Sequence, residues 1–204
     1  MNYDTLPQGH QCIRTIDMKD PKLAIKLNLL GIPVYLALLV PMGFLVPPNT
    51  ALPFRAAETA GSRDLLSDLL FLAIFMISSV GFVVLHELIH AMMFRAVAKA
   101  KPGFGFTGLV AYCNCETKYI CRRHYYAIAL APLVLMTVLL AAVCAVVPQS
   151  WFWIPYLVLV LNAGGSAGDV WICGVMARLP ADILMIDRGA CMDIYSKQGG
   201  EGGV

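Results

Sequence analysis

The chain has 204 residues, of which 59% are hydrophobic and only 14% are charged. Soluble domains are typically about half apolar and one quarter charged, so this composition argues against an ordinary soluble protein and favours a membrane protein. The formal net charge of +2 is too small to indicate a nucleic-acid partner, and we expect none.

The first 28 residues are polar and of mixed charge, and we predict a cytoplasmic N-terminal segment over residues 1–28. A cleavable signal peptide would pass from a short basic stretch directly into an apolar core, so the first apolar stretch is interpreted as a retained membrane span. The seven cysteines are scattered over apolar and polar segments, which favours reduced thiols over a secreted disulfide framework.

Four long apolar stretches follow, at about residues 29–46, 69–97, 125–147 and 151–176. Each meets or nearly meets the roughly 20 residues that a helix needs to cross the hydrocarbon core. Prolines interrupt the first stretch, but neighbouring helices can satisfy the freed backbone groups. The sequence therefore predicts an all-α membrane protein of about four transmembrane helices, with its membrane domain over residues 29–178.

The distribution of the 15 lysines and arginines predicts the orientation of these spans. Nearly all of them lie in the N-terminal segment, in the connection 98–124 and in the tail after the fourth stretch. With four spans these segments fall on one side of the membrane. Because positively charged segments stay in the cytoplasm, both termini are predicted to be cytoplasmic.

The connection 98–124 is predicted to form a small cytoplasmic β-hairpin between the second and third helices. Its glycines alternate with apolar residues, which favours two short strands, and a polar patch indicates a turn near residues 114–117. The connection is counted within the domain 29–178.

The remaining residues, 179–204, are predicted to form a cytoplasmic tail. The segment from Asp182 to Tyr195 could fold back as a short strand pair, and we predict that Asp187 and Asp193 are solvated. The end of the tail is polar and glycine-rich, which predicts disorder.

The second apolar stretch contains the motif His-Glu-Leu-Ile-His. Residues four apart share one helix face, so His86 and His90 can bind one metal ion, and Glu87 can reach a water bound to it. Zinc binds imidazole readily and lowers the pKa of its water toward ~7, which would let Glu87 act as a general base. The alternative is that these residues only join helices, but burying all three without a metal would be hard to satisfy.

Asp169 is the predicted third ligand, since a catalytic zinc site usually has three protein ligands. It is the only acidic residue in the fourth apolar stretch, and it lies about as far into its span as His86 does into the second. The glycines before it permit local unwinding or ordinary close packing. Asn162 could donate a hydrogen bond to a substrate carbonyl or could join helices, and packing is slightly favoured.

A second cluster, Cys113, Cys115, Cys121 and His124, forms the pattern C-x-C-x5-C-x2-H. It could hold a second, structural metal ion. The spacing is unlike that of common zinc modules, so we favour the simpler interpretation of small apolar residues on a strand.

At these residues the chain resembles the site-2-protease-like intramembrane zinc metalloproteases, and more closely a group of small bacterial membrane zincin peptidases. The resemblance rests on the motif at 86–90, on Pro132 early in the following span, and on the segment from Asn162 to Asp169. It covers about residues 69–187. In that class, two histidines and a later aspartate hold Zn²⁺ and the glutamate is the base, which matches the assignment made from the residues.

The resemblance also implies a place for the substrate and for the protein. An edge strand near the active site holds an extended substrate in such enzymes, so the strand Gly103–Cys113 could pair with a substrate by strand addition, with Phe106 and Gly108 as contacts. The alternative is a plain packed hairpin at the membrane surface. The location implied is the bacterial inner membrane.

The function that the sequence predicts is hydrolysis of peptide bonds in membrane-anchored proteins or peptides near the cytoplasmic interface. The expected partners are the lipid bilayer and such a substrate, and homo-oligomer formation is left open. Three alternatives remain: a zinc-dependent hydrolase of small peptides or non-peptide amides, a non-catalytic membrane scaffold that retains the metal site, and a transporter. Glu87 argues against the scaffold because a structural zinc needs no base, and the lack of an evident repeat argues against the transporter.

Overall fold

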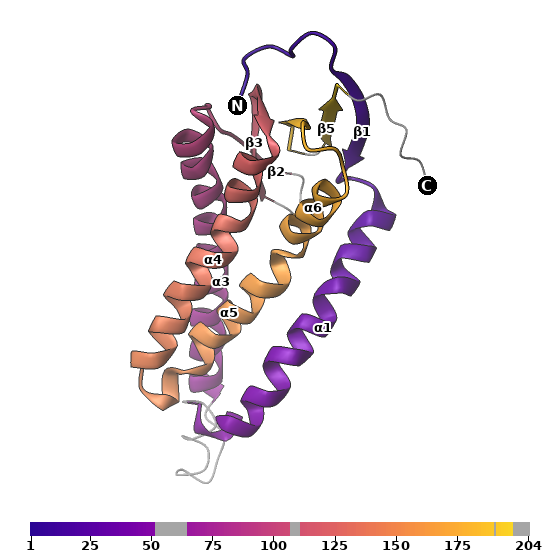
Figure 1. Cartoon of the computed structure of the whole chain (residues 1–204). Helices are drawn as coiled ribbons and strands as arrows, with labels where there is room; N and C mark the ends of the chain where they lie inside the picture. The colour runs from indigo at the N-terminus through magenta and orange to yellow at the C-terminus, as the bar shows by residue number, and fades with distance from the viewer. Residues whose placement is uncertain (52–64, 107–110, 190, 198–204) are drawn as a thin grey trace. The chain divides into compact units, whose positions relative to one another are not determined.

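The computed structural model describes residues 1–51, 65–106, 111–189 and 191–197 (Figure 1). The chain divides into two compact units, each described here by itself. The sheet unit comprises Met1–Leu27, His86–Pro132 and Gly168–Val204, and the helical unit comprises Asn28–Leu85 and Leu133–Ala167.

Four helical segments in the described part of the chain are long and apolar enough to cross a membrane, by length and composition. Each overlaps one predicted span, so the structure is compatible with a membrane protein. The segments are α1 (Pro21–Leu45), α3 (Leu65–Met93) continued by the π-helical turn η2 (Phe94–Ala98), α4 (Arg122–Val146), and α5 (Trp153–Gly165) followed by α6 (Ala167–Ala177). Two short 3-10 helices, η1 (Pro48–Thr50) and η3 (Gln149–Trp151), lie between them in sequence.

The prediction of an all-α protein with only a small hairpin is wrong, because the sheet unit contains a five-stranded antiparallel sheet. The strand order is β1-β5-β4-β3-β2, and Figure 1 shows β1 beside β5. The strands are β1 (Gln11–Asp17), β2 (Gly103–Phe106), β3 (Ala111–Cys121), β4 (Leu184–Asp187) and β5 (Cys191–Ser196). The strands of the connection 98–124 therefore belong to the same sheet as β1 near the N-terminus and β4 and β5 in the tail.

An antiparallel strand pair does form in this connection, but the prediction is wrong in its turn and in the bounds of its strands. Strands β2 and β3 pair antiparallel, from Gly103 opposite Asn114 to Phe106 opposite Ala111. Residues 114–117, where the turn was predicted, lie inside β3. The second half of β3 pairs with β4, which is why this strand is longer than the hairpin alone would require.

The predicted strand pair in the tail is confirmed as β4 and β5, and β5 continues to Ser196. The end of the tail, over residues 198–204, lies outside the described residues. In β5 every second residue is buried, the pattern of a strand with one face on a core.

The core of the sheet unit lies where one face of the sheet packs on helical residues of the same unit. The helical side is formed by the end of α3 with η2, the first turns of α4, and α6. Among its most deeply buried members are Phe94, Ile128 and Met176 from the helices, and Ile120, Met185 and Ile194 from the strands. The turns that follow the His-Glu-Leu-Ile-His motif are thus held against the sheet.

Two glycines make room for the ring of Tyr112 in β3. A Cβ atom on Gly105 in β2, or on Gly189 after β4, would overlap this ring, and Gly189 also has a positive φ of 78°. The observed position of the Tyr112 ring therefore requires glycine at both positions.

We predict that Gly189→Ala destabilises the protein by roughly 1–3 kcal/mol, because it adds a steric overlap and backbone strain. Thermal unfolding in detergent measures the effect. The matched control is Gly174→Ala in α6, where nothing lies within 4 Å of the added Cβ and helix propensity favours alanine. Equal melting temperatures for the Gly189 variant and the wild type would contradict this packing.

Candidate metal centre

Helices α3 and α6 supply the side chains of the predicted metal site, and all of them belong to the sheet unit. His86 and His90 are one turn apart on α3, with ring centroids 5.0 Å apart. Asp169 lies in the first turn of α6, which begins after the break at Ser166. A carboxylate is electrostatically favoured at this end of a helix.

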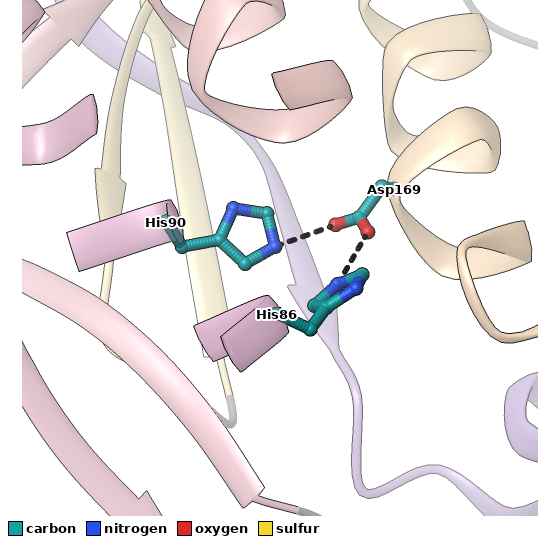
Figure 2. Close-up of side chains that lie close together, drawn as sticks. All are labelled: His86, His90 and Asp169. Atoms are coloured by element: carbon teal, nitrogen blue, oxygen red, sulfur yellow. Dashed lines mark ion pairs between the residues drawn. The ribbon is translucent and has the colours of Figure 1, made fainter. Parts of the chain in front are cut away.

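Both imidazoles come from α3, and they face the carboxylate of Asp169 on α6, as Figure 2 shows. His86 Nε2 lies 3.5 Å from Asp169 Oδ2, and His90 Nε2 lies 3.7 Å from Asp169 Oδ1. Each imidazole is only 12% exposed and the carboxylate 23% exposed. In the described part of the chain, these three residues are the group of potential metal ligands whose ligand atoms all lie within 4.8 Å of one another.

This arrangement fits zinc. The two distances exceed the 2.7–3.2 Å of a direct N–H···O hydrogen bond. They are close to the roughly 3.3 Å that separates two donor atoms, each about 2.0–2.1 Å from one tetrahedral zinc ion. Two imidazole nitrogens and one carboxylate oxygen are also a donor set that zinc accepts, with a fourth position left for water or substrate.

The second ring nitrogen of His90 fixes the orientation of its imidazole. His90 Nδ1 lies 3.1 Å from the backbone carbonyl oxygen of Ile128 in α4. A carbonyl can only accept, so Nδ1 carries the proton and Nε2 keeps its lone pair for a ligand. Such a partner is the usual support of a metal-binding histidine.

Glu87 follows His86 on α3 and reaches the sheet. Its carboxylate accepts a hydrogen bond from the backbone of Cys113 in β3. The predicted base therefore lies between the first histidine and a strand of the sheet. Its position is suitable for a proton acceptor beside a metal-bound water.

The two predicted substrate residues that the structure describes belong to different units, Asn162 to the helical unit and Phe106 to the sheet unit. Asn162 is fully buried in the helical unit, where its Nδ2 donates to the Leu133 carbonyl at 3.2 Å and to Thr137 Oγ1 at 3.0 Å. These bonds join α5 to α4 and favour the packing interpretation. Phe106 is exposed on the edge strand β2, and Gly108 lies outside the described residues.

The second metal site, which the sequence left open and did not favour, finds no support among the described residues. Asn2 occupies the space between two of its members, because its Oδ1 accepts from the Cys121 backbone N–H at 3.1 Å and lies 3.0 Å from His124 Nδ1. Burial raises the pKa of the Cys113 thiol to about 12. The potential ligand atoms that come together in the described part of the chain are those of His86, His90 and Asp169.

Asp187 is the residue that the sequence analysis placed wrongly. It was predicted to be solvated, but it is only 8% exposed at the end of β4. Its Oδ1 accepts the Gly189 backbone N–H at 2.8 Å, and its Oδ2 accepts the Tyr125 hydroxyl at 2.8 Å. Burial raises the pKa of this carboxyl to about 6.

Asp193 was also predicted to be solvated, and it is in fact partly buried. It forms an ion pair with Arg188 at 3.3 Å and accepts a hydrogen bond from the Thr15 hydroxyl at 2.8 Å. The second contact ties β5 to β1.

The site is a group of two imidazoles and one carboxylate on apolar helices that could hold a metal ion. A family model described as "Putative zincin peptidase" matches residues 79–184, which is more than half of the chain and includes His86, Glu87, His90 and Asp169. The chain therefore belongs to this family, and membership indicates a zinc metallopeptidase.

One relative and the solved structures complete the comparison. The chain is 26% identical over 156 residues to the "Uncharacterized 24.7 kDa protein in gap 5'region" of Pyrococcus woesei. The match covers 74% of this chain and 65% of that protein, so the chain spans slightly less than two thirds of its relative. No solved structure matches the chain.

The raised pKa of Asp187 predicts how stability depends on pH. The folded pKa of about 6 lies above the ordinary value of 3.8, so this group contributes stability at low pH that is lost as the pH rises through about 6. We expect the wild type to lose roughly 1 kcal/mol more than Asp187→Asn between pH 5 and pH 7. Unfolding measured at both pH values in both proteins checks this, and identical pH dependence would contradict the buried carboxyl.

Proposed function

We propose that this protein is a membrane-embedded zinc metalloprotease, similar to site-2 proteases, that hydrolyses membrane-anchored proteins or peptides near the cytoplasmic interface. The observation that carries the proposal is the convergence of His86, His90 and Asp169 from two apolar helices, with Glu87 beside them. Ionisable side chains in such helices are costly and are usually retained for function.

The proposed chemistry assigns a role to each of these side chains. His86, His90 and Asp169 would hold zinc, which when bound polarises a peptide carbonyl and acidifies a water molecule. Glu87 accepts the proton of the attacking water and then delivers it to the nitrogen of the departing amine. The Ile128 carbonyl keeps His90 in the tautomer that this arrangement needs.

Strand β2 supports a site for an extended substrate. It is an edge strand of the sheet, and its Phe104 lies opposite Cys113, whose backbone contacts Glu87. A substrate strand could pair with the free edge of β2, and β2 would then lie between the substrate and Cys113 in β3. Phe104 and Phe106 project from the same face of β2 and are exposed, so they could contact substrate side chains.

The charge of the sheet unit supports its placement at the cytoplasmic face. This unit contains nearly all of the lysines and arginines of the chain, and both termini belong to it. By the positive-inside rule we place this unit on the cytoplasmic side of the bacterial inner membrane. The bilayer and an anchored substrate are then the partners.

We predict that Glu87→Gln lowers the rate of peptide hydrolysis by roughly 10²-fold or more while bound zinc is kept, because the variant loses the base and no ligand. The assay uses purified protein with a panel of single-span substrates, together with metal analysis. Glu116→Gln is the matched control, an exposed glutamate on β3. Full activity of the Glu87 variant would contradict Glu87 as the base, and zinc-loaded wild-type protein that hydrolyses none of the substrates would favour a metal-bearing scaffold.

We predict that Phe106→Ser raises KM roughly tenfold for an anchored substrate at unchanged kcat, because an apolar contact is lost in substrate binding alone. Steady-state kinetics in detergent or vesicles measures both constants. Phe44→Ser is the control, an exposed phenylalanine on α1. A fall in kcat at constant KM would contradict the role assigned to β2.

A further inference from the structure

Pro132 creates a free backbone acceptor inside α4. A residue in the interior of a helix donates its N–H to the carbonyl four residues earlier, and proline has no N–H to donate. The carbonyl of Ile128 therefore lacks its ordinary helical partner. Ile128 is 1% exposed and Pro132 is among the most deeply buried residues, so water is not at hand to replace the missing donor.

The donor that this carbonyl finds is the Nδ1 of His90, at 3.1 Å. A buried carbonyl without a donor would cost free energy. The N–H of His90 supplies the donor that Pro132 lacks, and the carbonyl gives this N–H an acceptor. The bond also directs Nε2 of the same ring toward Asp169. All three residues belong to the sheet unit.

We propose that Pro132 is a positioning residue of the metal centre, which keeps the Ile128 carbonyl available to His90 and thereby fixes the orientation and tautomer of the imidazole. Its consequence for metal binding rests on the proposed function. Its consequence for the tautomer can be measured in the metal-free protein and does not depend on that function.

The turn of α4 that carries this carbonyl is itself anchored to the sheet. Tyr125, one turn before Ile128, is buried and donates its hydroxyl to Asp187 Oδ2 at 2.8 Å. Asp187 in turn accepts the Gly189 backbone N–H. The acceptor for His90 is thus held between a proline on its C-terminal side and a buried hydrogen bond on its N-terminal side.

A purely structural proline would behave differently on substitution. Pro132→Ala restores an N–H at position 132, which competes with His90 for the Ile128 carbonyl, and alanine is a better helix former. If the proline served only to shape the helix, the variant would leave the imidazole unchanged. If it positions His90, the folded variant loses the fixed tautomer.

The test is ¹⁵N NMR of the histidine side chains in the metal-free full chain in detergent. We expect Nδ1 of His90 to carry a proton in all molecules of the wild type and in only some molecules of Pro132→Ala. Pro33→Ala in α1 is the control, another proline inside a candidate membrane helix, and it should leave the His90 signals unchanged. A wild-type His90 without a proton on Nδ1 overturns the proposal, and this measurement does not depend on folding of the variant.

Zinc affinity gives the second readout. Competition with a chelator should show a dissociation constant about 10-fold or more higher for Pro132→Ala than for the wild type, the usual effect of removing the support of a metal ligand. Equal affinities and an unchanged tautomer in the variant would overturn the proposal. A wild type that holds no zinc but shows the Nδ1-protonated tautomer, lost in the variant, would contradict the proposed function and still support the role of Pro132.

Discussion

The constraint on which the structure depends is the burial of four ionisable side chains in apolar helices. His86, Glu87 and His90 on α3, and Asp169 on α6, would each be costly there without a compensating partner. Convergence of the two imidazoles on one carboxylate meets part of this cost. A divalent cation would meet the rest, because it balances the two carboxylates and takes the imidazole lone pairs.

The sheet belongs to the site as much as the helices do. It binds the end of α3, the beginning of α4 and α6 through a common core. Through β3 it supplies a backbone contact to Glu87, and through Asp187 in β4 it holds Tyr125 in α4. These contacts matter because a metal site requires its ligands to be held within a few tenths of an ångström, and α3 and α6 are separated by many residues in the chain.

Sequence reasoning succeeded where the determining interactions are local. The spacing of His86 and His90 is set by the helix itself, and the four long apolar helices follow from the length of the apolar stretches. It failed where pairing is non-local. Strand β1 shows no clear alternation of buried and exposed residues and is a strand because it pairs with β5, at the far end of the chain. Asp187 was placed in solvent because its burial depends on Tyr125, which lies in another element.

The most direct test of the central claim is the zinc content of the purified wild type beside His86→Ala and Asp169→Ala, in detergent. The account predicts about one zinc per wild-type chain, lost in both variants, because each removes one of three protein ligands. Folded wild-type protein without metal would contradict the metallopeptidase. Zinc lost with His86 but kept with Asp169 would contradict the assignment of the third ligand.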